Sequence, residues 1–170
     1  KYHITKLKEL LDDTDYTSLD NQIITPGNTG WIGQVKLNAQ LQAALNPGYR
    51  DGMPVARHTW AKAEEYYIAV NDKIIVTSNM YDLGIAGIMN GETGKVLEIT
   101  AFGDIIVDFG TETVSIPPII NVERNGKEIS YNPQKSLDLA YAVTTHKTQG
   151  SEYQNIIYLI DKCHSYTLCR

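Results

Sequence analysis

Residues 139–160 constrain the fold of this 170-residue chain more than any other segment. Two apolar runs, 139–143 and 155–160, flank a polar run of nine residues. Short apolar runs rich in valine, isoleucine and tyrosine predict buried strands, and the polar run predicts a loop at the edge of their sheet. Because ligands of open α/β sheets gather at the carboxyl ends of the strands, this loop is the first candidate binding site.

The polar run reads Thr144-Thr145-His146-Lys147-Thr148-Gln149-Gly150-Ser151-Glu152. Turn chemistry alone enriches threonine, glutamine, glycine and serine, so an ordinary polar turn is the plain alternative. The order of the residues, however, closely resembles motif V of the superfamily 1 helicases. The preceding residues 139–144 resemble the RecD-like branch of that superfamily in particular.

This resemblance implies two sets of contacts for the loop. The positions that match nucleotide-binding residues of the family are Gln149, Gly150 and Glu152. The positions that match DNA-binding residues are Thr144, Thr145, His146 and Lys147. A carboxylate can accept hydrogen bonds from a ribose hydroxyl, and a glycine lets the backbone approach a ligand closely. Two alternatives stay open: His146 as a core histidine bonded to a backbone carbonyl, and Lys147 as the partner of an acidic neighbour.

Composition and charge are those of a soluble globular protein, with 42% hydrophobic and 21% charged residues. The net charge of −5 gives no overall basic field, so a nucleic acid would have to be held by a local loop. No apolar stretch approaches the roughly 20 residues of a membrane helix, and the first residues lack a signal-peptide core. We therefore expect a cytoplasmic protein with no membrane partner and no metal site. Cys163 and Cys169 lack further ligands at zinc spacing, which favours a reduced pair.

Helix and strand signals alternate in the first half of the chain. Residues 1–13 have apolar positions at helical spacing, and residues 22–25 form a short apolar run that Pro26-Gly27 ends. A second helix is expected to end at Asn46-Pro47-Gly48. Its apolar stripe consists of Val35, Leu37, Leu41, Ala44 and Leu45. Residues 73–78 predict a strand.

A second part of the chain resembles the same family. Residues 32–47 carry glycine, Leu-Asn, Leu-Gln and Leu-Asn-Pro in the order found in the second motor domain of RecD-like proteins. The glycine-rich run 27–33 before them is typical of a connector. It departs from the family in one respect, because Gly27-Asn28-Thr29 lacks the basic residue that members often carry there. A nucleotide contact at that position is therefore not carried over to this chain.

The pattern changes between residues 89 and 120 to short strands and tight turns. The turn dipeptides are Asn90-Gly91 and Thr93-Gly94, and the expected strands are 95–100, 105–109 and 112–116. Several short strands at close spacing predict a small barrel. In the RecD-like family a barrel of the Src-homology-3 type is inserted here, and Asn90-Gly91-Glu92-Thr93-Gly94 resembles its opening signature.

The predicted fold class is therefore α/β: a partial RecA-like parallel sheet with helices, carrying an inserted small all-β Src-homology-3-like barrel. Residues 1–82 and 138–170 are expected to form the two parts of the second RecA-like motor domain, ending before its last motif. Residues 83–137 are expected to form the barrel. We expect the strands at 73–78 and 139–143 to share one parallel layer.

Several parts of an ATPase are absent from the sequence. The sequence has no G-x-x-x-x-G-K-[ST] phosphate-binding loop and no Walker B acidic pair. The segment Gly91–Lys95 resembles such a loop, but its glycines are too closely spaced, and Val96 has no hydroxyl to bind Mg²⁺. Arg170 resembles the arginine that precedes the last motif, not the arginine finger. We expect the isolated chain to be inactive, with no catalytic residue of its own.

The resemblance implies that the full-length protein is an ATP-dependent DNA helicase that moves 5′ to 3′ and acts in DNA repair or recombination. This chain would contribute half of the ATP cleft and part of the single-stranded DNA track. ATP and Mg²⁺ would bind the full-length protein, and the N-terminal RecA-like domain of the same chain would be the partner. The alternative is a non-catalytic nucleic-acid- or protein-binding α/β module with a β-barrel. A third possibility, a hydrolase using His146 with Glu152 or a serine, is disfavoured because the sequence has no G-x-S-x-G pattern.

Overall fold

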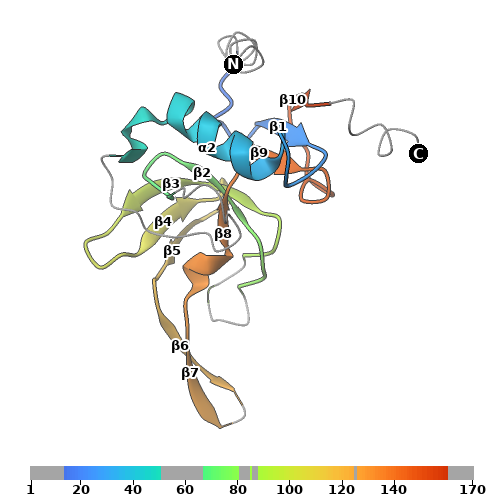
Figure 1. The fold of residues 1–170 in the computed structure, drawn as a ribbon. Coiled ribbons are helices and arrows are strands. Elements are labelled where there is room, and N and C mark those ends of the chain that lie inside the picture. Colours follow the sequence, from blue (N-terminus) through green and yellow to red (C-terminus); the bar gives the residue numbers. More distant parts are fainter. Residues whose placement is uncertain (1–13, 51–66, 81–84, 86–87, 125, 161–170) are drawn as a thin grey trace.

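A computed structural model describes residues 14–50, 67–80, 85, 88–124 and 126–160 of the chain (Figure 1). The strands are β1 (Asn21–Thr25), β2 (Lys73–Val76), β3 (Thr93–Ile99), β4 (Ile105–Asp108), β5 (Thr113–Ile116), β6 (Ile120–Arg124), β7 (Lys127–Tyr131), β8 (Leu137–Leu139), β9 (Ala142–Thr144) and β10 (Asn155–Tyr158). The helical elements are α2 (Gln34–Leu45) and the 3₁₀ turns η1 (Pro47–Arg50) and η3 (Pro133–Ser136). The expected helix at 1–13, both cysteines and Arg170 lie outside the described residues.

Three parallel strands form one sheet in the order β10-β1-β9. Ile24 is paired with Val143 and Thr25 with Thr144, while Ile23 is paired with Ile157 on the other side. Strands β1 and β9 are buried along their whole length, as expected for strands covered on both faces. Helix α2 lies against β9. A parallel sheet with a covering helix beside antiparallel strands confirms the predicted α/β class.

A five-stranded antiparallel sheet has the order β5-β4-β3-β2-β8 and lies below α2 in Figure 1. Strands β3, β4 and β5 occur within two residues of their predicted bounds. The β6–β7 ribbon projects away from both larger sheets (Figure 1). The sequence prediction missed this ribbon, although Asn125-Gly126 is a typical hairpin turn dipeptide.

The expectation that residues 73–78 and 139–143 share one parallel layer is wrong. Strand β2 pairs antiparallel with β8, where Ile75 faces Asp138, and antiparallel with β3. The apolar run 139–143 is divided, because the chain leaves β8 after Leu139 and enters the parallel sheet at Ala142. The buried Gln22 amide donates to the carbonyls of Ala140 and Tyr141 and so satisfies the backbone where the ladder is interrupted.

One hydrophobic core runs through both larger sheets. Its buried members include Ile23 of β1, Leu41 of α2, Ile74 of β2, Val107 of β4 and Leu139 of β8. Full burial of each such side chain contributes about 1.5–3 kcal/mol. The two sheets are therefore joined by packing as well as by the chain that connects them.

Helix α2 also carries a polar stripe, which we call the amide stripe. It consists of the buried Gln34, Asn38 and Gln42 and, just past the helix end, the half-buried Asn46. These residues are four apart and share one face of the helix. The Asn38 amide donates to Leu139 O (2.7 Å) and accepts from Ala142 N (2.7 Å), which holds the crossover from β8 to β9. Leu37 and Leu41 are buried as predicted, but Val35, Ala44 and Leu45 are only partly buried.

The amide stripe ends at Asp72, a fully buried carboxylate directly before β2. Its Oδ1 accepts from Asn46 Nδ2 (2.7 Å) and from the Tyr141 hydroxyl (2.8 Å). Its Oδ2 accepts from Gln42 Nε2 and from Ala69 N (2.8 Å). Burial raises the pKa of Asp72, and the four hydrogen bonds act in the opposite direction because all of their donors favour the ionised carboxylate.

Replacing Asp72 with alanine should therefore destabilise the chain strongly. The Tyr141 hydroxyl and Ala69 N–H would remain buried without an acceptor, and we expect a loss of about 3 kcal/mol or more in the free energy of unfolding. Urea unfolding of the parent, Asp72→Ala and Asp72→Asn measures this, with the asparagine variant intermediate because it keeps one acceptor oxygen. The control Glu112→Ala, at an exposed carboxylate, should change stability by less than about 0.5 kcal/mol. Equal effects of Asp72→Ala and Glu112→Ala would contradict the network.

The next residue, Lys73, is a second fully buried charged side chain. Its ammonium donates to Asn21 O (2.7 Å) and Ser18 O (3.0 Å), which ties β2 of the antiparallel sheet to the start of β1. Burial lowers the pKa of Lys73 to about 8 from 10.5, while Asp15 and Asp20 act in the opposite direction. The folded chain thus releases this proton at a lower pH than the unfolded chain does.

This difference predicts a pH dependence of stability. Between pH 8 and 10.5 the unfolded chain still binds the Lys73 proton while the folded chain has released it, so the contribution of Lys73 to stability rises with pH. Relative to Lys73→Met, the parent should gain about 3 kcal/mol across this window. Unfolding curves of both proteins at several pH values measure the gain. If the difference in unfolding free energy between the parent and Lys73→Met stays constant from pH 7 to 10.5, the Lys73 ammonium is not desolvated in the folded chain.

Candidate functional site

Two loops begin side by side at the carboxyl edge of the parallel sheet. Strands β1 and β9 end in register at Thr25 and Thr144. The chain then forms a loop over residues 26–33 and a loop over residues 145–154. The N–H of Thr145 donates to Thr25 O (3.1 Å), so the two loops are joined where they leave the sheet.

The loop after β9 begins with a hydrogen-bonded turn. The N–H groups of Lys147 and Thr148 donate to Thr144 O, at 2.9 and 3.3 Å, and the Thr148 hydroxyl donates to Thr145 O (3.0 Å). Gly150 then has a φ of +88°, a left-handed conformation that glycine adopts without strain. The turn fixes the backbone of the loop and leaves several of its side chains at the surface.

The structure separates the predicted site residues into three groups. Thr145, His146, Gln149, Gly150 and Glu152 are exposed at the carboxyl edge of the sheet. Thr144 is buried within β9, which leaves its side chain inaccessible. Lys147 is half-buried and pairs with Asp138. The exposure of His146 shows that the alternative of a core histidine is wrong.

The ammonium of Lys147 lies toward β8. Its Nζ is 3.0 Å from Asp138 Oδ2, and Gln34 Nε2 donates to the same oxygen at 3.1 Å. Asp138 is buried, so this ion pair is shielded from solvent on its acidic side. Lys147 thus connects the loop to the first residue of α2 and to the amide stripe, and the alternative of an acidic partner is confirmed.

The loop after β1 is compact and carries an exposed aromatic ring. The Thr25 hydroxyl donates to Ile32 O, and Gln34 N donates to Gly27 O (3.0 Å). A Cβ on Gly33 would lie 2.4 Å from Thr29 C, so only glycine fits there. Trp31 is 80% exposed, and the ammonium of Lys36 lies 4.5 Å from the centroid of its ring. The sequence prediction treated this loop as a connector, although a tryptophan between glycines in a polar run is unusual for one.

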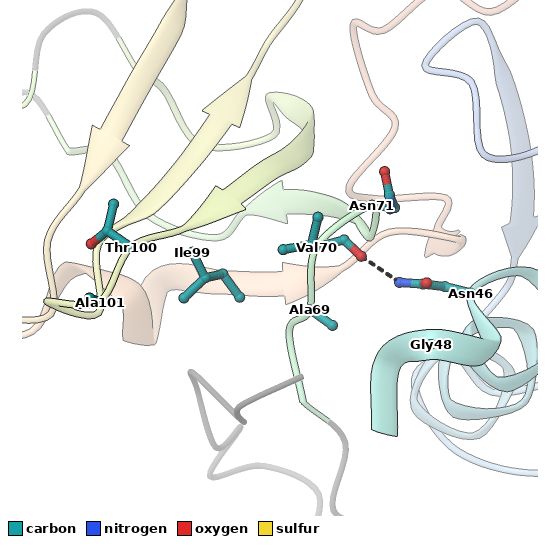
Figure 2. A pocket seen from close by; sticks show the side chains of 8 residues that line it. All are labelled: Asn46, Gly48, Ala69, Val70, Asn71, Ile99, Thr100 and Ala101. Carbon is teal, nitrogen blue, oxygen red and sulfur yellow. Dashed lines mark hydrogen bonds between the residues drawn. The ribbon is translucent and has the colours of Figure 1, made fainter. Parts of the chain in front are cut away.

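A separate pocket of about 400 Å³ lies near the other end of α2 (Figure 2). Its lining residues are Asn46, Gly48, Ala69, Val70, Asn71, Ile99, Thr100 and Ala101. Asn46 donates to Val70 O (2.8 Å), the bond drawn in Figure 2. No charged side chain and no residue of the loop after β9 lines this pocket, which gives no support to a phosphate site there.

Residues 14–50, 67–80, 85, 88–124 and 126–160 contain neither a candidate metal site nor a candidate membrane-spanning helix. No group of three or more histidine, cysteine, aspartate or glutamate side chains in these ranges could hold a metal ion. No helix among them is both long and apolar enough to cross a membrane.

No protein-family model matches this chain. It is similar to the ATP-dependent RecD2 DNA helicase of Deinococcus radiodurans, with 31% identity over 149 residues. The matched region covers 88% of this chain but 17% of that helicase, so the chain spans about one sixth of the length of this relative.

Two solved structures of Pif1 from Bacteroides sp. show a looser likeness. The complex with ADP-AlF4 matches 89% of this chain and 36% of its own, with a TM-score of 0.48 and 16% identity. The unliganded protein matches 91% of this chain and 50% of its own, with a TM-score of 0.45 and 20% identity. At these values the likeness by itself establishes no function.

Proposed function

We propose that this chain is part of the second motor domain of a RecD-like, ATP-dependent DNA helicase that moves 5′ to 3′. The observation that carries the proposal is the loop after β9. Its motif V sequence stands at the carboxyl edge of a parallel sheet, where α/β proteins bind ligands, and five of its predicted site residues are exposed there. Similarity to the RecD2 DNA helicase over most of the chain supports the same assignment.

The DNA side of the loop consists of Thr145 and His146. A hydroxyl and an imidazole at an exposed strand end can donate hydrogen bonds to phosphate oxygens, which position a strand without reading its sequence. A motor must pass every base, so weak discrimination between bases suits this chemistry. Thr144 contributes backbone support, and Lys147, held by Asp138, positions the turn.

The nucleotide side consists of Gln149, Gly150 and Glu152. The left-handed turn at Gly150 brings the backbone to the surface, and the exposed Glu152 carboxylate can accept hydrogen bonds from a ribose. The phosphate cradle and the Mg²⁺ ligands that phosphoryl transfer requires would come from the N-terminal RecA-like domain of the complete protein. The chain alone would therefore contribute half of an ATP cleft without hydrolysing ATP.

The five-stranded antiparallel sheet is proposed to be the inserted Src-homology-3-like barrel. Because β2 and β8 pair within it, the barrel would begin about ten residues before the predicted range 83–137 and end two residues after it. The division into motor and barrel parts is supported by the change from parallel to antiparallel pairing at Ala140–Tyr141. A role in DNA repair or recombination in the cytoplasm belongs to the same proposal.

The proposal predicts that the complete protein loses DNA affinity when Thr145 or His146 is replaced with alanine. Removing one contact of this kind should weaken binding of single-stranded oligonucleotides roughly 5- to 15-fold, similarly for different sequences. DNA-stimulated ATP hydrolysis should fall more than basal hydrolysis does. Fluorescence anisotropy and a phosphate-release assay measure the two effects.

Two control variants sharpen this test. Thr113→Ala, at an exposed threonine of β5, should leave DNA binding unchanged. Lys147→Gln should leave the salt dependence of DNA binding unchanged, because Lys147 is paired with Asp138. If Lys147 instead contacted a phosphate, its removal would lower the slope of log K against log salt concentration by about 0.7. Unchanged affinity and unchanged stimulation in both the Thr145 and His146 variants would remove this loop from the DNA path.

A further inference from the structure

We propose that Trp31 and Lys36 form a stacking site for one base of single-stranded DNA, beside the loop after β9. The inference rests on the proposed function, since it adds a contact to the same DNA track. The supporting geometry is a ring that is 80% exposed, with an ammonium 4.5 Å from its centroid.

The exposure of Trp31 follows from the way in which its loop is held. The Thr25 hydroxyl binds Ile32 O, and the N–H of Gly33 donates to Gly30 O (3.3 Å), so hydrogen bonds fix the chain on both sides of the ring. The absence of a Cβ at Gly33 allows the backbone to pass close to Thr29. A large apolar side chain held outward on a fixed backbone loses little conformational entropy when a ligand binds to it.

The loop that carries Trp31 is joined to the start of the loop that carries Thr145 and His146. Ile32, its neighbour in the chain, is bonded to Thr25 through the threonine hydroxyl. Thr145 is bonded to the same Thr25 through its carbonyl. In the proposed track, a strand whose phosphates contact Thr145 and His146 places one base on the indole ring where the two loops meet.

Lys36 supplies the charge that such a site needs. Proteins that bind single strands combine basic groups along the backbone with aromatic rings on which bases stack, and stacking tolerates every base. The first N–H groups of α2 bind loop carbonyls, with Gln34 N on Gly27 O and Val35 N on Asn28 O, so they are not free for phosphate. Lys36, in the first turn of α2, is thus the cation that lies against the ring.

The position of the ammonium also favours DNA over an apolar protein surface as the occupant. A cation over an exposed ring contributes only about 0.5–1 kcal/mol, so a phosphate can draw it away at little cost. Burying the ring against an apolar surface would instead desolvate the charge, which is unfavourable.

The test uses the 170-residue chain with Trp60→Phe, which leaves Trp31 as its one tryptophan. Oligothymidylate of about ten nucleotides, and an abasic oligomer of the same length, are the probes. Thymidylate should quench Trp31 emission, and Trp31→Ala should weaken its binding roughly 5- to 150-fold, the equivalent of 1–3 kcal/mol for one stacked base. The abasic oligomer should bind parent and variant alike. Lys36→Gln should lower the salt slope of oligothymidylate binding by about 0.7, the value for one lost phosphate contact on a single strand.

Phe102→Ala is the matched control, because Phe102 is 88% exposed in the turn between β3 and β4, and it should leave binding unchanged. Oligothymidylate could bind in a way that depends on Thr145 and His146 without quenching Trp31 emission and without losing affinity in Trp31→Ala. That result would overturn this inference and leave the proposed function standing. An equal penalty on the abasic oligomer would also overturn it, because the ring would then not stack on a base. No binding of either oligomer by the 170-residue chain would overturn this inference alone, because the proposed function is tested separately on the complete protein.

Discussion

The buried carboxylate of Asp72 is the interaction on which the rest of this structure depends. Removing a carboxylate from water costs several kcal/mol unless hydrogen bonds replace its hydration. The four donors that replace it come from three parts of the chain: α2 and its end, the backbone at Ala69, and Tyr141 in the crossover between the sheets. The carboxylate can be satisfied only when these parts meet, so one buried charge specifies how the helix and both sheets come together.

The candidate site depends on the same arrangement. The amide stripe that begins at Gln34 contacts Asp138, and Asp138 in turn holds Lys147 in the loop after β9. The opposite end of the stripe reaches Asp72, and its second member, Asn38, holds the first residue of β9. The helix therefore places the β9 loop relative to the β1 loop, which precedes α2 directly. The geometry of this edge depends on polar groups of the core, because the side chains that position the loops are buried amides.

Short apolar runs and turn dipeptides were sufficient to predict the positions of most strands, because each strand's burial pattern is a local property of the sequence. Pairing was not predictable in the same way: the run 139–143 is uniformly apolar, and only the Gln22 amide, more than a hundred residues away, shows where it divides. The place of the loop after β9, at the end of a buried strand, could be predicted from the apolar runs that flank it. The pairing of Lys147 could not, since it depends on where β8 places Asp138, and the exposure of Trp31 depends on the bonds of Thr25.

Hydrogen–deuterium exchange of the complete protein, with and without saturating oligothymidylate and a non-hydrolysable ATP analogue, tests the central claim most directly. We predict that DNA slows exchange in residues 26–33 and 145–147, that the nucleotide slows exchange in residues 149–152, and that neither changes the β6–β7 ribbon. Fluorescence anisotropy checks that both ligands are fully bound. If exchange in both loops is then unchanged, the carboxyl edge of the parallel sheet is not the binding site.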